Sequence, residues 1–136
     1  MKILVFGGSG FLGCHVVDAL MAKGYEVHIA DLLPPKHGTE DYNYHHCDIL
    51  QRDSINALFA SHDFKAVYNF AGMADIDKAA LNPLDTMKLN VLGNMHILES
   101  CRDSSVERYI FASSAYASSL RGSFYGISKL TSEKIV

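Results

Sequence analysis

A glycine-rich segment near the start of the sequence has the spacing of a phosphate-binding loop. It can be read as G-x-G-x-x-G from Gly8 or as G-x-x-G-x-x-G from Gly7. Such a loop makes a tight turn and brings backbone N–H groups at a helix start close to a pyrophosphate. We therefore expect a dinucleotide here, and a loop that serves only helix packing is the alternative. The residues expected to contact it are Gly7, Gly10, Phe11, Leu12 and Gly13.

An acidic residue stands where a dinucleotide-binding fingerprint needs one. Asp31 follows Gly13 by 18 residues and closes an apolar stretch. Its carboxylate would accept hydrogen bonds from the adenosine ribose and would repel a 2′-phosphate, so the sequence favours NAD over NADP. An aspartate that only shapes a turn is the alternative.

A second group of residues has the side-chain types that proton transfer needs. Tyr125 and Lys129 lie four residues apart, and on a helix both side chains project from one face. An ammonium group close to a phenol favours the phenolate, which exchanges a proton with a substrate hydroxyl. Ser114 adds a hydroxyl after another apolar stretch. A solvated helix face is the alternative for the Tyr/Lys pair.

The elements that must position these residues are short apolar strands that alternate with helices. Strands are expected at 2–6, 26–30, 42–47, 66–71 and 108–112, and helices at 11–23, 54–62, 83–101 and from 124 onward. This alternation predicts a doubly wound α/β fold with a parallel sheet, in which ligands bind at the carboxyl ends of the strands. An apolar stripe on the helix over 83–101 is expected to pack in the core. The stripe consists of Leu84, Met87, Val91, Met95 and Leu98.

Composition limits the class of protein. The chain has 136 residues, 49% hydrophobic and 20% charged, which corresponds to one globular domain. Its formal net charge of −3 argues against a nucleic-acid partner. The apolar run at 3–6 is too short for a signal sequence or a membrane span, and the three cysteines lack disulfide or zinc spacing. We expect a cytoplasmic protein without a membrane partner.

Four consecutive residues look like metal ligands. They are His45, His46, Cys47 and Asp48. Neighbouring residues on a strand point to opposite faces, so these side chains do not converge on one ion and no metal is expected.

Together the motifs resemble the extended short-chain dehydrogenase/reductase superfamily, in particular its NAD-dependent epimerase/dehydratase family of nucleotide-sugar enzymes. The resemblance covers the whole chain and rests on motifs in the family's order. They lie at residues 7–13, 31, 47–49, 69–72, 90–93, 111–114 and 125–129. The resemblance implies an NAD-binding Rossmann-like domain over 1–136, truncated before the second half of the sheet and the substrate lobe.

The resemblance also implies roles in cofactor binding. Asp48 would meet the adenine, with Ile49 beside it in the cofactor site. Ala71 and Gly72 would line the cofactor by their backbone, and Asn90 would support the site from its helix.

The implied catalytic residues are Ser114, which would hold the reacting oxygen, Tyr125 as the acid/base, and Lys129, which would bind the nicotinamide ribose and tune Tyr125. In the implied reaction NAD takes a hydride from a sugar carbon while Tyr125 removes the hydroxyl proton, and an epimerase returns the hydride to the opposite face. Dehydratases of the family carry Asp and Glu where this chain has Ala115 and Tyr116. An epimerase that acts on a UDP-linked sugar is therefore favoured.

Two other functions stay open, a non-catalytic NAD(H)-binding sensor and an NAD(P)H-dependent carbonyl reductase. In relatives, the two long helices after the fourth and fifth strands commonly form a four-helix dimer interface. The resemblance therefore also implies a homodimer, and the stripe over 84–98 could serve in it.

Overall fold

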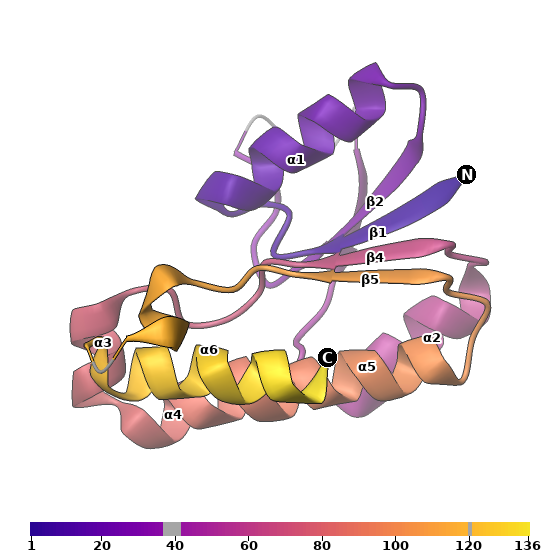
Figure 1. Ribbon diagram of the computed structural model, residues 1–136. Coiled ribbons are helices and arrows are strands. Elements are labelled where there is room, and N and C mark those ends of the chain that lie inside the picture. Colours follow the sequence, from indigo (N-terminus) through magenta and orange to yellow (C-terminus); the bar gives the residue numbers. More distant parts are fainter. Residues whose placement is uncertain (37–41, 120) are drawn as a thin grey trace.

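The computed structural model describes residues 1–36, 42–119 and 121–136. The strands of the described residues form one five-stranded parallel sheet in the order β3-β2-β1-β4-β5 (Figure 1). The strands are β1 (Lys2–Phe6), β2 (Glu26–Asp31), β3 (Asn43–His46), β4 (Ala66–Asn69) and β5 (Arg108–Phe111). The predicted doubly wound α/β fold is confirmed.

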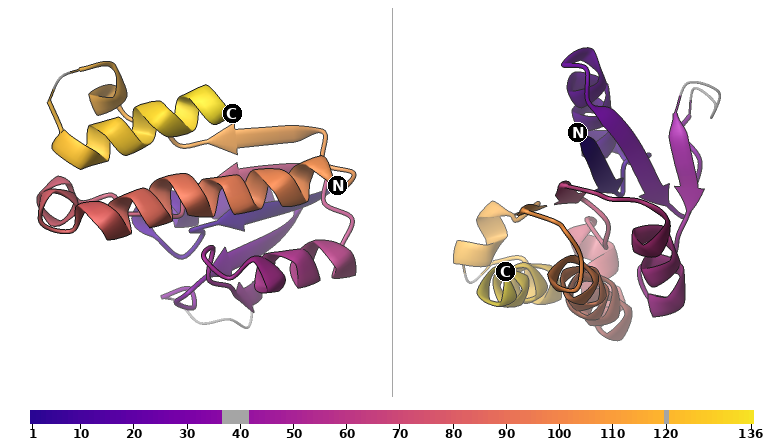
Figure 2. Two further views of the ribbon diagram at one scale, coloured as in Figure 1. Left: turned by 90° about the horizontal axis from the view of Figure 1, so that it is seen from below. Right: turned by 90° about the vertical axis from the view of Figure 1, so that its right-hand side faces the viewer.

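Helices cover both faces of the sheet. They are α1 (Phe11–Ala22), α2 (Arg52–Ser61), α3 (Ile76–Leu81), α4 (Pro83–Met87), α5 (Gly93–Arg102) and α6 (Ser123–Ile135), with a π-helical turn η1 (Lys88–Leu92) and a 3-10 turn η2 (Ala115–Ser118). Helix α1 lies on one face, and α2, α5 and α6 lie on the other (Figure 2). Among the described helices, none combines the length and the apolar character that a membrane crossing requires.

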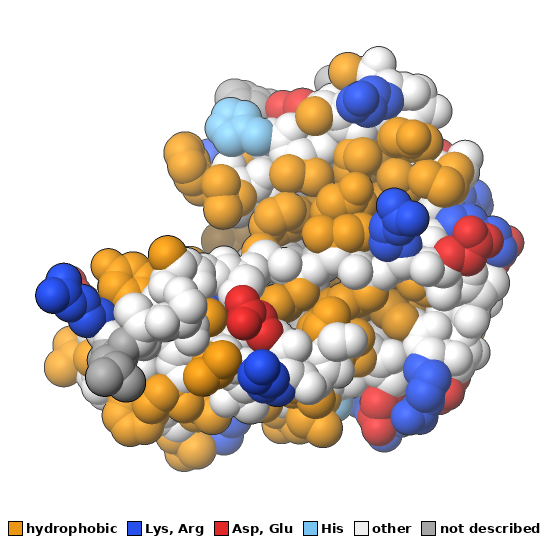
Figure 3. Space-filling view, viewed as in Figure 1, with side chains coloured by type: hydrophobic (Ala, Val, Ile, Leu, Met, Phe, Trp, Pro, Cys, Tyr) orange, Lys and Arg blue, Asp and Glu red, His pale blue; other side chains and the backbone are white. Residues whose placement is uncertain are grey.

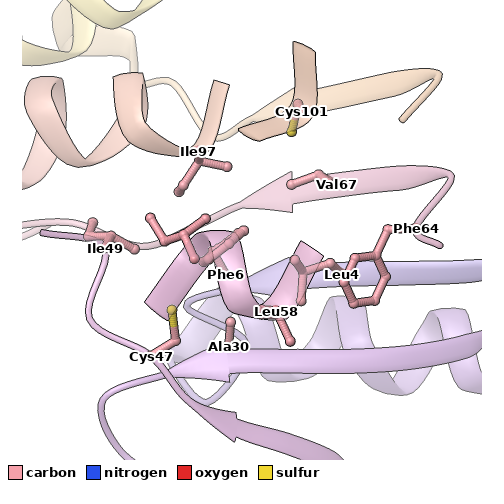
Figure 4. Close-up of a cluster of buried hydrophobic side chains, with 11 residues drawn as sticks. Leu4, Phe6, Ala30, Cys47, Ile49, Leu58, Phe64, Val67, Ile97 and Cys101 are labelled. Carbon is pink, nitrogen blue, oxygen red and sulfur yellow. The ribbon is translucent and has the colours of Figure 1, made fainter. Parts of the chain in front are cut away.

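Strand β1 lies at the centre of the sheet and supplies both halves of the core. Its side chains alternate, so Ile3 and Val5 pack under α1, whereas Leu4 and Phe6 face α2 and α5. All four side chains are buried. Figure 4 shows Leu4 and Phe6 in the hydrophobic cluster that faces α2 and α5, with Ile97 of α5 above them. Burial on both faces explains why β1 is a continuous apolar run.

The sheet face under α1 is only partly covered. Tyr68 and Phe70 pack at the edge of the α1-side cluster and are half-buried, as is Ile110, which pairs with Tyr68 in β5. Figure 3 shows hydrophobic side chains gathered between α1 and the strands β4 and β5. A single helix therefore leaves apolar surface exposed on this side of β4 and β5.

The expectation that the stripe over 84–98 packs in the core is wrong. Leu84 and Met95 are exposed, and the other stripe residues are only half-buried. The buried face of this helical segment carries Ile97 and the polar residues Thr86, Asn90 and Asn94. Thr86 donates to the carbonyl of Asn82, Asn90 donates to Ser128, and the side-chain oxygen of Asn94 accepts from Asn69. The side-chain nitrogen of Asn94 is buried without a partner among the described residues. The segment is also not one helix, because the π-helical turn η1 joins α4 to α5 and shifts the helical phase.

A pair of leucine variants tests where the core lies. Leu4→Ala removes a fully buried side chain and leaves a cavity, so we expect the free energy of unfolding to fall by roughly 3–5 kcal/mol. Leu81→Ala is the matched control, because Leu81 is 81% exposed, and it should change stability by less than about 0.5 kcal/mol. Urea denaturation monitored by circular dichroism measures both; equal losses would contradict the assigned core.

Candidate functional site

The carboxyl ends of the strands surround a crevice of about 490 Å³ with mostly apolar walls. Eleven of the residues expected to bind a cofactor line it. They are Gly7, Gly10, Phe11, Leu12, Gly13, Asp31, Asp48, Ile49, Ala71, Gly72 and Lys129. Four further lining residues lie within the motifs noted in the sequence but were given no cofactor role, namely Cys47, Phe70, Ala112 and Ser113. The lining residues outside those motifs are Ala30, Leu32, Ala74 and Leu89. Most residues of these two groups directly precede or follow a strand end, and that position is the signal that could have found them.

The glycine-rich loop is shaped by backbone contacts that leave no room for side chains. Gly7 has φ +72°, and a Cβ atom on it would lie 2.6 Å from the backbone nitrogen of Ala71. A Cβ atom on Gly13 would lie 2.1 Å from the carbonyl oxygen of Gly7. These approaches place the first turn of α1, with its free N–H groups, at the crevice. Phe11 in that turn is 83% exposed and stands at the crevice wall.

Asp31, at the end of β2, is held in place by the neighbouring backbone. Its carboxylate accepts hydrogen bonds from the N–H of Ser9, at 3.0 Å, and from the N–H of Leu33, at 3.2 Å. The first bond ties the carboxylate to the glycine-rich loop. Both carboxylate oxygens keep free lone pairs, so the group can still accept from the hydroxyls of a ligand in the crevice.

The opposite wall is supported by buried amides. The side chain of Asn69 accepts from the N–H of Ala71 at 3.0 Å. Asn90 accepts from the N–H of Met73 at 2.7 Å and donates to the carbonyl of the same residue at 3.0 Å. Asn90 is buried behind Gly72 and does not line the crevice, so its position matches a supporting role better than direct contact with a cofactor.

Asp48 and Ile49 follow β3 at the end of the crevice near Asp31. The carboxylate of Asp48 accepts from the N–H of Leu50 at 2.9 Å, which fixes the turn. Ile49 is buried and packs against Gly93 at the start of α5. The pair therefore offers one polar and one apolar wall for a flat ring.

Two serines follow β5, and they have different surroundings. Ser113 lines the crevice, and its hydroxyl donates to the carboxylate of Glu133 in α6. Ser114 caps the 3-10 turn η2 by accepting from the N–H of Tyr116 at 3.2 Å. Its hydroxyl hydrogen remains available for another acceptor. Ser114 does not line the crevice itself.

Helix α6 places Tyr125 and Lys129 on its buried side, as the four-residue spacing predicts. The ammonium of Lys129 donates to the carbonyl of Ala112 at 2.8 Å and lies 5.9 Å from the centre of the Tyr125 ring. It also lies 4.8 Å from the centre of the Phe111 ring. Lys129 lines the crevice, whereas Tyr125 is not among the lining residues. A solvated Tyr/Lys face is therefore ruled out.

Burial changes the acidity of this lysine. Lys129 is 6% exposed, and the loss of hydration lowers its pKa from 10.5 to about 8. The side chain is therefore still mostly cationic at pH 7 and loses its charge just above neutrality.

The residues of the crevice fit a dinucleotide. The loop from Gly7 to Gly13 leaves space only for backbone, which is what a pyrophosphate needs to approach the first turn of α1. The hydroxyl of Ser9 in this loop is buried without a hydrogen-bond partner in the described structure. A parallel sheet, a glycine turn that opens α1 and an acidic residue that closes β2 define a Rossmann-like dinucleotide-binding domain.

The sequence model of the NAD dependent epimerase/dehydratase family matches residues 3–136, so the chain belongs to this family and NAD is its cofactor. The expectation of NAD is thereby confirmed. The sequence is 32% identical over 125 residues to UDP-glucose 4-epimerase of Yersinia enterocolitica. The matched region covers 85% of this chain and 37% of that protein. The mouse UDP-glucose 4-epimerase is also 32% identical, over 130 residues.

Solved structures show the same architecture. The UDP-glucose 4-epimerase of Thermotoga maritima, solved with UDP-glucose, superposes with a TM-score of 0.91 at 27% identity and covers 99% of this chain and 50% of that one. The enzyme of Thermus thermophilus, in complex with NAD, also has a TM-score of 0.91 at 27% identity. The chain therefore spans about half the length of these solved relatives.

The buried lysine predicts how stability depends on pH. In the unfolded chain Lys129 has an ordinary pKa near 10.5, so between pH 8 and 10.5 the unfolded state binds more protons than the folded state. Below pH 8 the folded protein carries the full free-energy cost of burying the Lys129 charge. As the pH rises above 8, Lys129 loses its proton and this cost disappears. The free energy of unfolding should therefore rise by roughly 3 kcal/mol over this range, relative to Lys129→Met.

Denaturation of the cofactor-free protein at several pH values checks this difference. Lys134→Met, on the exposed end of the same helix, should give a curve parallel to that of the unmodified protein. If the Lys129→Met curve is also parallel, Lys129 does not titrate as its burial requires.

Proposed function

We propose that this chain is the cofactor-binding part of an NAD-dependent epimerase that acts on a UDP-linked sugar. The observation that carries the proposal is the buried Tyr125–Lys129 pair beside a crevice suited to NAD. The similarity to UDP-glucose 4-epimerases supports the substrate class. NAD, when bound, supplies the two-electron oxidant of such a reaction and returns the electrons afterwards.

The protein residues would handle the proton. The Tyr125 oxygen takes the proton of the sugar hydroxyl as the carbon beneath it is oxidised, and gives it back when the ketone is reduced. The ammonium of Lys129 lies 5.9 Å from the centre of the Tyr125 ring, so a positive charge would stand near the proposed proton acceptor. The Ser114 hydroxyl, oriented by its bond to the N–H of Tyr116, would donate to the reacting oxygen.

The residues after Ser114 favour epimerisation over dehydration. Elimination of water needs an acid and a base, which dehydratases of the family supply as Asp and Glu at the positions of Ala115 and Tyr116. A methyl group cannot transfer a proton, and Tyr116 packs edge-on against the Tyr125 ring at 6.2 Å between centroids. The proposed reaction is therefore removal and return of the electrons at one carbon.

The sugar would be bound by a part of the protein outside these 136 residues. The chain covers 37% of the Yersinia enterocolitica relative, and the apolar face over β4 and β5 is only partly covered. We therefore assign residues 1–136 to the NAD-binding domain of a longer protein. The free thiols of Cys14, Cys47 and Cys101 support a reducing location such as the cytoplasm.

A non-catalytic NAD(H)-binding sensor is the second candidate. It is favoured by one observation, that neither Ser114 nor Tyr125 lines the crevice. An epimerase converts its sugar substrate and a sensor does not. A carbonyl reductase differs from both because it consumes NADH.

Replacement of the phenol separates these functions. In the complete natural polypeptide, Tyr125→Phe should lower kcat for the interconversion of UDP-glucose and UDP-galactose by roughly 10²–10⁴-fold, because the proton acceptor is lost. The dissociation constant of NAD should stay unchanged. Tyr25→Phe, on the surface, is the control and should keep full activity.

Retained turnover in Tyr125→Phe would remove this residue from the mechanism. Absence of turnover in the unmodified polypeptide, with NAD bound, would favour the sensor. Net oxidation of NADH by a ketone would instead identify a reductase.

We further propose that the exposed stripe over 84–98 and helix α6 form a homodimer interface. The α4–α5 segment and α6 lie side by side (Figure 2), and Met95, Ile127 and Leu130 are exposed on them. Two copies of such a surface would bury apolar area that is otherwise left in water.

A charge on this surface tests the dimer. Met95→Glu would place a carboxylate in the apolar contact and should halve the mass measured by light scattering after size exclusion. Met21→Glu, on α1, is the control and should leave the mass unchanged. A monomeric unmodified protein would contradict the proposed interface.

A further inference from the structure

Three histidines from three different elements converge on the sheet face that α2 covers. His28 lies in β2, His45 lies in β3, and His62 follows the end of α2. One ring nitrogen from each lies within 4.8 Å of the other two. His28 is 4% exposed, and the other two are half-buried. None of the three lines the NAD crevice.

Hydrogen bonds fix which nitrogen of two rings carries the hydrogen. The Nε2 atom of His28 lies 3.1 Å from a carboxylate oxygen of Glu26, and the Nδ1 atom of His62 lies 3.1 Å from the carbonyl oxygen of Leu58. Carboxylate and carbonyl oxygens only accept, so these two nitrogens donate. The remaining nitrogens, Nδ1 of His28 and Nε2 of His62, therefore keep lone pairs.

The third histidine completes the group. The Nε2 atom of His45 lies 2.9 Å from the Nδ1 atom of His28, and the two ring planes are within 6° of parallel, which suits a hydrogen bond in the plane of the rings. Without a ligand, His45 donates to His28 through this nitrogen. When its proton moves to Nδ1, Nε2 of His45 gains a lone pair and becomes available as a third ligand atom.

The surroundings are those of a metal site. Histidines that bind metals usually donate their other ring N–H to a carboxylate or a backbone carbonyl, and Glu26 and Leu58 already supply both kinds of acceptor. His62 directly follows the carboxyl end of α2, where the helix dipole favours a cation. The ammonium of Lys2 lies 3.4 Å from the same Glu26 carboxylate.

We propose that His28, His45 and His62 form a binding site for one divalent late transition metal ion, with Zn²⁺ as the best fit. Three neutral imidazoles are ligands that such ions prefer, whereas Mg²⁺ and Ca²⁺ prefer oxygen. Zinc–nitrogen bonds of about 2.0–2.1 Å place tetrahedral ligands about 3.4 Å apart. The three nitrogens, which lie within 4.8 Å of one another, would have to adjust to about that separation on binding. The fourth position is left for water.

The ion has a path to the site and a structural effect. His62 also lines a cleft of about 500 Å³ between the carboxyl ends of α2 and α5, which opens to solvent. A bound ion would join α2 to β2 and β3, which are already paired with each other in the sheet; at this point His62 otherwise contacts His28, His45 and Phe64 through their rings. The expectation of no metal considered only the consecutive residues from His45 to Asp48. In the proposed site, His45 is joined by His28 and His62, which lie in other elements of the fold.

Zinc titration of the complete, metal-free polypeptide tests the site. Isothermal titration calorimetry should detect the binding of one Zn²⁺ per chain, and it should detect no binding of Mg²⁺ at this site. The affinity should fall at least ~100-fold in His45→Gln and in His62→Gln, because each removes one ligand. Free Zn²⁺ at a concentration 100 times its Kd should raise the Tm of the unmodified protein by roughly 5 °C or more. The same concentration should leave the Tm of His45→Gln and His62→Gln unchanged.

Two further variants separate metal binding from ring packing. His46→Gln is the matched control, because His46 adjoins His45 but points to the opposite face and bonds to the carbonyl of Leu32. It should bind Zn²⁺ as the unmodified protein does. Glu26→Ala leaves all three rings in place but removes the acceptor of His28, so binding should weaken about 10–100-fold.

Cobalt gives a direct view of the ligands. Co²⁺ at this site should produce the intense visible absorption of a tetrahedral ion, which His62→Gln abolishes and His46→Gln retains. Failure to bind Zn²⁺, or equal binding by His45→Gln, His46→Gln and His62→Gln, would overturn the proposal and leave the cluster as aromatic packing.

Discussion

The close approach of Gly13 to the carbonyl of Gly7 is the constraint on which the crevice depends. Because no side chain separates them, α1 starts directly at the end of β1, and its first turn faces the space where a pyrophosphate would lie. The same loop is tied to β2 by the bond from the N–H of Ser9 to Asp31. Backbone proximity, more than any particular side chain, therefore creates the cofactor end of the site.

The other end of the crevice depends on buried amides. Asn69 donates to Asn94 and to the hydroxyl of Tyr109, and Asn90 donates to the hydroxyl of Ser128 in α6. Burial raises the pKa of Tyr109, so its hydroxyl keeps its proton and remains a donor. These bonds connect the crevice wall to α5 and α6. Breaking the bond between Asn90 and Ser128 would leave buried polar groups without partners, so this bond favours one position of α6, and with it the position of Lys129. In the described structure, the side-chain nitrogen of Asn94 is the atom of this network that lacks a partner.

Features that depend on local spacing could be predicted from the sequence, and features that depend on distant partners could not. The glycine turn, Asp31 and the alternation of strands and helices are local, and the structure has them where they were expected. The stripe that includes Leu84 and Met95 was misassigned, because its opposite face is buried through bonds to β4 and α6 that no local pattern reveals. Helix α3 was missed because its six residues give too little periodicity; only the Asp75 cap marks its start. The histidine cluster is likewise assembled from three separate elements.

The strand order has a consequence for how the chain is made. β1 leaves the ribosome before the other four strands of this sheet, yet it lies at the centre, where Ile3 pairs with both Val27 and Ala66. Its contact with β2 forms early, because α1 alone separates the two strands. The other edge of β1 stays unpaired until β4 has been synthesised. Until then the nascent sheet presents the unpaired edge of an apolar strand. Vectorial synthesis of this fold therefore includes an aggregation-prone stage, at which the growing polypeptide is a natural client for chaperones.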